Sequence, residues 1–558
     1  MRKLSTFIVL LVCCLSLCFG GTSRLYDSMS IEYQRVRKLC LMTGDLGPTS
    51  ASPMTESELY RAYLRIDKSK LDERSLSEYE ELGEIFEDEE KPLDFVVSIN
   101  PFLYETTLKD TLDNEEFLLP YRKMPAFIEY GLKASFGDFA FLEMYLEEAN
   151  MERIDVLDSD KNVVSSYQSV YDSSFDLFLK HQNGKWYSYF DGIRPVYKFQ
   201  NTPTIARGAI SNEFTSLIFG RTKQEFGGGY TGNLVLSDNF RYQEMLGFAF
   251  FNDEFNYRLN LTHFDPQRSD EKYDTSYFSG KQNERLVHRI EVSLGRRFRA
   301  AVNLGLMIYA ERGFDIRHLT PMMFVHNWYN FSEDEVIRNS DEANNVMSFE
   351  LEALPFDGFR ISGQAIIDQI TQIGEEVVNV PNALGFLANA SYLKSHSHFD
   401  AEYFIEAYYS TPSLYLNKKK NEDMTWNWNF DWVVGYAREG VGDAHYSGHP
   451  YGPDTIMSAL GVNLDFRDID LRSENILEYK ISGSQAKNRN TVFSFDKKSP
   501  TGICETRLSL RSYNSLVATE SLSIHLDFGM SHYKNFRYNE GENKTLFQLA
   551  FGVKWEII

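Results

Sequence analysis

The chain has 558 residues, with 80 acidic and 57 basic side chains and a formal net charge of −23. Hydrophobic residues make up 43% of the chain and aromatic residues 15%, which excludes an intrinsically disordered protein. The acidic balance argues against a nucleic-acid-binding protein, because such a protein needs a basic face to neutralise phosphates.

The N-terminus has the pattern of an export signal. Two basic residues precede an apolar run over residues 7–19, which is too short to span a membrane as a helix. We therefore predict a signal peptide over residues 1–20 and a mature chain that begins near Gly21. Lipidation of Cys18 is the alternative, because the residues before it loosely resemble a lipidation motif.

The next segment, residues 21–92, is predicted to be a small helical domain, because its apolar residues recur at helical spacing. Thr55 and Glu58 have the spacing of a capping box, which places a helix start at Thr55. A further helix is predicted at about residues 75–86. The stretch 72–90 contains ten carboxylates and is interpreted as a solvated face that leads into a linker.

From Leu93 to the end of the chain the apolar period changes from about 3.6 to 2, the alternation of β-strands. The clearest case is residues 547–557, where large apolar side chains alternate with small or polar ones. One face of such a strand suits lipid and the other suits a polar lumen. Tight hairpin turns are predicted at Gly137-Asp138, Asn252-Asp253 and Asp357-Gly358.

Long polar stretches separate these hairpins, and short turns on one side with long loops on the other are typical of outer-membrane barrels. At about 25 residues per strand and connection, residues 93–558 give about 18 strands. The predicted fold class is therefore all-β, an antiparallel transmembrane β-barrel with the helical domain at its periplasmic end. The alternative is a secreted all-β protein, although the chain lacks the repeat of about 40–50 residues expected of a propeller.

Motifs for catalysis or cofactor binding are weak. Residues 227–232 satisfy GxGxxG, but no helix follows them, so we interpret them as a loop that folds into a lumen or against a sugar. His396 and His398 could share a strand face and chelate a metal, but no third ligand is evident, so we interpret them as two exposed histidines of a loop or the lumen. We predict no metal, no cofactor and no enzymatic activity. Cys40 and Cys504 remain as one possible disulfide pair.

The segment from Gly220 onward resembles the Wzi-type capsule assembly family of outer-membrane barrels. That family has a glycine-arginine pair, a tryptophan-glycine-proline-glycine run and a leucine-serine-asparagine segment. The matching stretches here are 220–221, 226–229 and 234–239, with Phe226 in place of the tryptophan and Gly228 in place of the proline. Further matching pieces follow in order, including residues 409–415 and 449–454.

The resemblance implies a barrel of about 18 strands that attaches capsule or other exopolysaccharide to the cell surface. Its partners would be surface polysaccharide and outer-membrane lipid. A diffusion porin and a surface adhesin or hydrolase remain as alternatives. The candidate glycan-binding or loop-forming residues are Arg221, Phe226, Gly227, Gly229, Gly232, Ser237, Asn239, His449, Gly452, Pro453 and Asp454.

The net charge should repel an acidic polysaccharide. Local cations, a bridging divalent cation or a neutral glycan would each remove this conflict. The local cations that we consider are Arg194, Lys198, Arg207 and Arg221.

Overall fold

The computed structural model describes most of the chain, and the structural statements below concern these residues. They are residues 23–87, 92–107, 128–157, 163–170, 180–182, 185–187, 197–199, 205–238, 243–264, 283–308, 319–320, 343–369, 382–420, 426–430, 433–438, 441–484 and 498–557. The predicted signal peptide, with Cys18, lies outside them. So do Asn239 and Arg194, whereas Lys198 lies in a described strand but has no described side chain.

Three helices form the N-terminal region: α2 (Ile31–Thr43), α3 (Glu56–Leu64) and α4 (Glu73–Glu87). The capping box at Thr55 and Glu58 is present at the start of α3, as predicted. The helices enclose an apolar core of their own that includes Val36, Leu39 and Leu82. The short strand β1 (Leu25–Tyr26) precedes the helices. The elements between them are β2 (Ala51–Ser52), β3 (Met54–Thr55) and the 3₁₀ turn η1 (Lys68–Lys70).

The rest of the described chain is a closed antiparallel barrel of 18 strands, which confirms the predicted fold class. In this count β4 and β5 are one strand interrupted near Pro101, because both pair with the last strand, β31. The barrel strands are β4 (Leu93–Ile99), β5 (Phe102–Thr106), β6 (Ile128–Phe136), β7 (Ala140–Leu157), β12 (Ile205–Ser211), β13 (Thr215–Thr222), β15 (Gln243–Phe251), β16 (Phe255–Phe264), β17 (Asn283–Ser293), β18 (Phe298–Ile308), β19 (Ala343–Phe356), β20 (Phe359–Gln369), β21 (Ala383–Ser395), β22 (Asp400–Ser410), β27 (Thr455–Phe466), β28 (Leu471–Ser482), β29 (Glu505–Thr519), β30 (Leu522–Lys534) and β31 (Asn543–Ile557).

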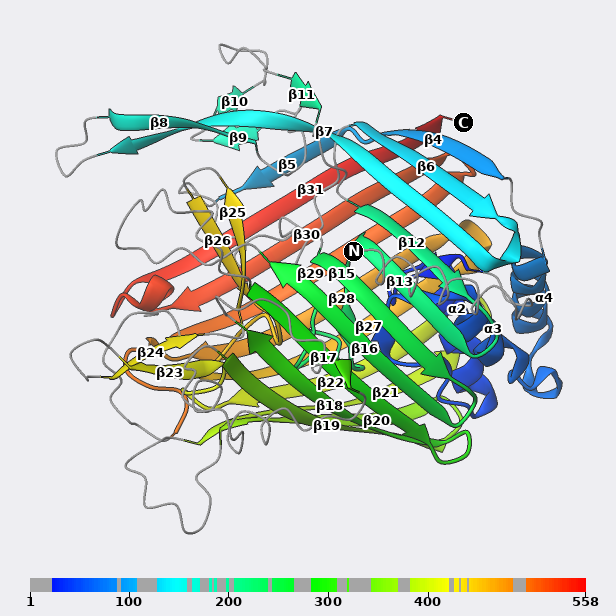
Figure 1. Ribbon diagram of the computed structural model, residues 1–558. Helices are drawn as coiled ribbons and strands as arrows, with labels where there is room; N and C mark the ends of the chain where they lie inside the picture. The colour runs from blue at the N-terminus through cyan, green and yellow to red at the C-terminus, as the bar shows by residue number, and fades with distance from the viewer. Residues whose placement is uncertain are drawn as a thin grey trace, which may run out of the picture.

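Shorter strands lie in the connections. They are β8 (Val163–Val170), β9 (Lys180–Gln182), β10 (Lys185–Tyr187), β11 (Tyr197–Phe199), β14 (Glu225–Phe226), β23 (Leu416–Lys420), β24 (Trp426–Phe430), β25 (Val433–Arg438) and β26 (Val441–Tyr446). Most extend beyond one end of the barrel, the long-loop end (Figure 1). The predicted hairpin turns near residues 137, 252 and 357 all lie at the other end, the short-turn end.

The barrel wall has an apolar outer face and a polar inner face. On β31, Phe547, Leu549 and Phe551 are exposed, whereas the residues between them are buried. This alternation is the one predicted from the sequence, and side chains two residues apart share a face because the period of a strand is two. None of the described helices is long and apolar enough to cross a membrane.

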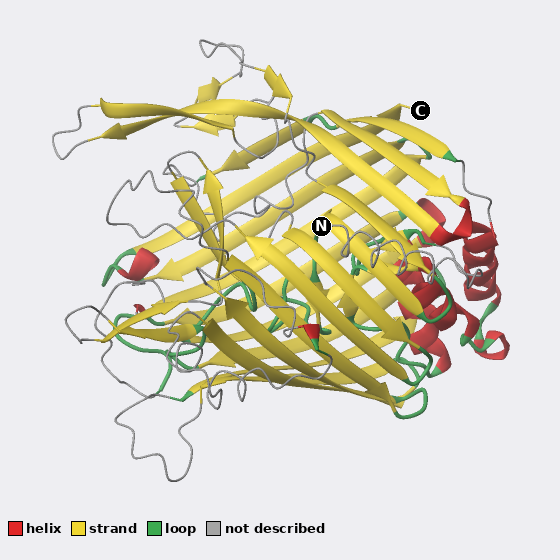
Figure 2. Ribbon diagram, viewed as in Figure 1, coloured by secondary structure: helices red, strands yellow, loops and turns green. Residues whose placement is uncertain are grey.

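The helices pack at the short-turn end of the barrel (Figure 2). Lys70 binds Asp357 at 2.8 Å in the turn between β19 and β20. Deeper, Asp400 at the start of β22 accepts contacts from Lys38 of α2 at 3.2 Å, Arg74 of α4 at 2.5 Å and Arg467 at 3.2 Å. A buried carboxylate of the wall therefore fixes two of the helices to the barrel.

The structure decides two side-chain questions that the sequence leaves open. Cys40 and Cys504 are both free thiols, because Cys40 is buried among the helices whereas Cys504 directly precedes β29 at the long-loop end. His396 and His398 do not share a strand face, because β21 ends at Ser395 and both lie in the turn that precedes Asp400. His398 is exposed there and contacts Asp468 at 3.2 Å.

Candidate functional site

The N-terminal region does not stop at the rim of the barrel, since the stretch between α2 and α3 enters the lumen. Thr49 donates a hydrogen bond to Glu291 of β17 at 2.9 Å, and Arg289 of the same strand donates to Ser50 at 2.9 Å. One residue further on, β2 pairs with β14, which places Ala51 opposite Phe226. This N-terminal stretch therefore meets the predicted glycine motif inside the barrel.

The Gly-rich loop, residues 226–237, lies in the lumen, and a carboxylate of the wall binds its backbone. Glu406 of β22 accepts hydrogen bonds from the backbone amides of Tyr230 and Thr231, each at 2.8 Å, and from the Thr231 hydroxyl at 2.6 Å. Gly229 fits because the loop is tight, and a Cβ atom there would clash with the carbonyl oxygen of Gly232. The sequence-based interpretation of residues 227–232 as a tight loop in a lumen agrees with this geometry.

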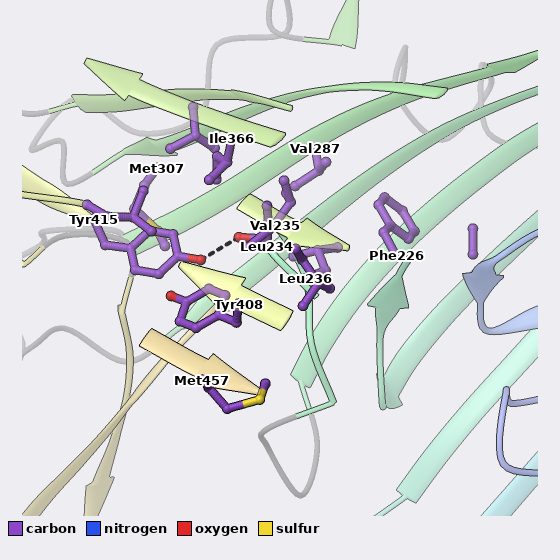
Figure 3. Packing of buried hydrophobic residues seen from close by; sticks show 14 of the residues in the cluster. Phe226, Leu234, Val235, Leu236, Val287, Met307, Ile366, Tyr408, Tyr415 and Met457 are labelled. Atoms are coloured by element: carbon purple, nitrogen blue, oxygen red, sulfur yellow. Dashed lines mark hydrogen bonds between the residues drawn. The ribbon is translucent and has the colours of Figure 1, made fainter. Parts of the chain in front are cut away.

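The end of the Gly-rich loop is apolar and packs across the lumen against the wall (Figure 3). The wall residues in contact come from consecutive strands between β17 and β28, and they include Val287, Met307, Val346, Ile366, Leu387, Tyr408, Met457 and Ile476. The loop residues Phe226, Leu234, Val235 and Leu236 are at most 1% exposed. Tyr415 closes this cluster by donating a hydrogen bond of 2.6 Å to the carbonyl oxygen of Leu234.

A second loop, residues 447–454, called here the His449 loop, lies against the first. The His449 ring stacks on Tyr408 with 3.8 Å between ring centroids. Its Nε2 lies 3.1 Å from the Thr231 hydroxyl, and its Nδ1 accepts the backbone N–H of Tyr451 at 3.3 Å. Because that hydroxyl already donates to Glu406, Nε2 carries the proton and the ring is neutral. Complete burial lowers the pKa of His449 to about 3.

The last residues of the His449 loop are fixed by backbone contacts. The carbonyl oxygen of Gly452 accepts the Ser410 hydroxyl at 3.0 Å, and that of Pro453 accepts the Thr455 hydroxyl at 3.0 Å. The Asp454 carboxylate accepts the backbone N–H of Thr501 at 3.1 Å, and burial raises its pKa. These three residues therefore shape the loop through contacts within the chain.

The structure brings most of the predicted site residues together but separates Arg221 from them. The side chain of Arg221 points to the outer face of β13, as does that of Phe219, and its Nε donates to Glu244 of β15 at 2.7 Å. Ser237, by contrast, is buried in the Gly-rich loop, where its hydroxyl donates to the carbonyl oxygen of Asn233 at 2.9 Å. Asn239 lies outside the described residues.

Sequence reasoning missed the wall residues that hold these loops, above all Glu406, Tyr408 and Gln364. Gln364 accepts the backbone N–H of Leu234 at 2.9 Å and donates to Asn233 at 2.6 Å. The available signal was an acidic or amide side chain at an inward position of a strand, where burial requires a partner. The described residues contain no group of three or more His, Cys, Asp or Glu side chains arranged to hold a metal ion.

A closed barrel with an apolar outer face, helices at one end and its own loops in the lumen is an outer-membrane β-barrel in fold. Neither a scan of known protein families nor a search of curated proteins finds a match to the chain. Among solved structures, the chain is similar to Wzi of Escherichia coli, described as a carbohydrate-binding β-barrel involved in group 1 capsule assembly. The TM-score is 0.56 at 14% identity, over 96% of this chain and 99% of Wzi. The barrel is therefore Wzi-like in fold.

Two further solved structures are similar at lower scores. OprD of Pseudomonas aeruginosa has a TM-score of 0.38 at 7% identity, over 83% of this chain and 95% of OprD. OccAB1 of Acinetobacter baumannii has a TM-score of 0.38 at 7% identity, over 84% of this chain and 97% of OccAB1.

Proposed function

We propose that this protein is a non-catalytic outer-membrane barrel that binds surface polysaccharide and helps to assemble or anchor capsule or exopolysaccharide. The observation that carries the proposal is the fold similarity to Wzi along 96% of the chain, because Wzi is described as carbohydrate-binding and as involved in capsule assembly. In this proposal the short-turn end and its helices face the periplasm, and the long-loop end faces the outside.

The contents of the lumen support a binding role over the alternative role of a diffusion porin. A diffusion porin needs a continuous water-filled path. Here the apolar end of the Gly-rich loop packs against wall strands from β17 to β28, and Leu25 packs against Phe141, Ala209 and Met245 on the other side. In planar bilayers we expect the purified protein to show no stable open-channel current, whereas a steady current would favour the porin.

The charges of the lumen support recognition of sugars by stacking and hydrogen bonding over recognition by ion pairs. Arg207, which we considered as a cation for an acidic glycan, binds Asp27 at 2.8 Å and also contacts Glu143. Arg221 is not a cation of the lumen, because it lies on the outer face of the wall, where it is bound to Glu244. Because these cations are already neutralised, we propose that aromatic faces at the long-loop end contact the glycan and that polar side chains bind its hydroxyls.

The decisive experiment is the ratio of cell-attached to shed polysaccharide in a deletion strain and its complemented partner. We expect deletion to move polysaccharide into the medium while total synthesis stays constant, because anchoring and synthesis are separate steps. Complementation should restore the ratio. A ratio that does not move would mean that the similarity to Wzi extends to the fold alone.

A further inference from the structure

A small polar patch lies on the outer, apolar face of the barrel. It consists of two residues of β28 and two of β29, which face each other in register as Ser473 with Asn514 and Asn475 with Ser512. We refer to these four residues as the polar patch. Polar side chains at such positions are unfavourable in hydrocarbon, so they require an explanation.

Alternation along the strands establishes that the patch faces outward. Leu477 follows Asn475 by two residues and is 43% exposed, and Leu510 precedes Ser512 by two residues and is also 43% exposed. Glu478 and Arg511, at the other parity, bind each other at 2.8 Å inside the barrel. Because side chains two residues apart share a face, the polar patch lies on the outside.

The polar patch is surrounded by apolar side chains on both neighbouring strands. On β27, Val462 lies opposite Asn475 and Leu464 lies opposite Ser473. On β30, Leu526 lies opposite Asn514 and Phe528 lies opposite Ser512. Leu526 and Phe528 are 48% and 39% exposed, so this row belongs to the apolar outer face. The patch is therefore inside that face, near its short-turn rim, because Ser473 is the third residue of β28.

Hydrogen bonds link the four residues but leave two donors and one acceptor unused. Ser473 donates to Asn514 at 2.7 Å, Asn475 donates to Ser473 at 2.9 Å, and Asn514 donates to Ser512 at 3.1 Å. Asn514 also donates to the carbonyl oxygen of Leu526 at 2.8 Å. Among the described residues, the Ser512 hydroxyl hydrogen, the second Asn475 N–H and the Asn475 Oδ1 have no partner. These groups belong to two residues that are directly opposite each other in the sheet.

We propose that the polar patch is the contact site for a second copy of this chain within the membrane. A two-fold axis at the patch places each chain's unused donor opposite the other chain's unused acceptor. Ser512 then donates to Asn475 of the partner subunit, and the same bond forms in reverse. The apolar residues around the patch pack in the same contact. Lipid tails provide neither donor nor acceptor, so the second copy satisfies groups that lipid leaves unsatisfied.

The test compares full-length protein with a variant in which both unused groups are removed. Asn475→Leu combined with Ser512→Leu keeps the barrel compatible with lipid, and heat-modifiable migration in gels checks that it folds. We expect energy transfer between labelled wild-type chains in lipid vesicles to show dimers, and the double variant to dissociate at least tenfold more readily. The matched control is Ala365→Leu with Ala388→Leu on β20 and β21, which should behave as wild type.

A cross-link tests the geometry independently of affinity. One chain carries Asn475→Cys and another carries Ser512→Cys, both with Cys504→Ser, and the two chains are mixed in vesicles. We expect the mixture to form a disulfide-linked dimer, whereas chains with Ala365→Cys and Ala388→Cys should not. The proposal is wrong if wild-type chains stay monomeric at every protein-to-lipid ratio, or if the double leucine variant associates as strongly as wild type.

Discussion

The helices and the lumen loops are both bound to the inner wall of the barrel, but by different kinds of contact. At the short-turn end, Asp400 binds three cations from the helices and the neighbouring turn. In the middle of the lumen, the Gly-rich loop is held by an apolar cluster and by hydrogen bonds to Glu406 and Gln364. The helices are attached by these ion pairs together with a small apolar cluster of Leu41, Leu46, Leu354 and Leu393, whereas the attachment of the loop depends mainly on packing.

This difference follows from the physics of burial. Apolar side chains gain free energy in proportion to the area removed from water, with little dependence on geometry. A buried ion pair gains little net free energy because both ions lose water, yet it strongly disfavours a state in which one partner is missing. We infer that the helices are positioned by a specific charge pattern, while the loop is stabilised by the area that it buries.

The largest effect is expected from neutralising the carboxylate that fixes the helices. Asp400→Asn removes the carboxylate that Arg74 binds, while Lys38 and Arg467 keep Glu78, and should cost about 3–5 kcal/mol in the attachment of α2 and α4. Hydrogen exchange of the α2 amides measures this loss. Asp468→Asn is the control, because its pair with His398 is solvent-exposed and should contribute less than about 1 kcal/mol.

A smaller effect is expected from a cavity in the apolar cluster. Leu236→Ala removes a side chain that is 1% exposed, and the wall around it cannot collapse fully, so the loop should lose about 2–4 kcal/mol. Faster hydrogen exchange over residues 227–237, with unchanged exchange in α2, would show that the two attachments are independent. Leu246→Ala, on the outer face of β15, should leave both regions unchanged. Equally faster hydrogen exchange in the helices and in the loop would contradict the conclusion that the two regions are attached independently.

The barrel itself was predictable because a period of two and the turn dipeptides are local signals. The helix starting at Thr55 was predictable for the same reason, since a capping box is confined to four residues. The entry of the N-terminal stretch into the lumen was not predictable. Its partner Phe226 is 175 residues away from Ala51 in the chain, and no local pattern encodes such a contact.

The candidate site, too, was only partly predictable, because its contacts join residues that are far apart in the chain. The glycines of residues 227–232 predicted a tight loop, but the residues that bind it, such as Glu406, come from strands more than 130 residues further along. The orientation of Arg221 follows from alternation, because Phe219 is two residues away and faces outward. Alternation therefore determines which predicted residues can reach the lumen.

Lowering the pH should weaken the attachment of the His449 loop, whereas the loop should stay fully attached at neutral pH. Burial holds the pKa of His449 at about 3, below the ordinary value of 6.5, so the unfolded loop binds a proton more readily. Its stabilisation is complete above about pH 6.5 and falls by about 1.4 kcal/mol per pH unit as the pH decreases toward 3. Exchange of the Tyr451 amide, measured from pH 7 to pH 5, reports this loss. His449→Gln should remove the contribution of His449 to this slope, whereas the raised pKa of Asp454 contributes with the opposite sign.

The smallest structural effect is expected at Arg221, which makes it the best residue for separating binding from folding. Its pair with Glu244 lies at the outer face, where Glu244 is 45% exposed, so Arg221→Ala should change the free energy of unfolding by less than about 1 kcal/mol. Glu244→Ala removes the same pair and serves as the matched control. If Arg221→Ala alone lowers polysaccharide retention, the arginine contacts the glycan, because the lost ion pair is common to both variants. If retention is unchanged in both, the glycan contacts lie elsewhere at the long-loop end, and the glycine-arginine pair serves the barrel wall only.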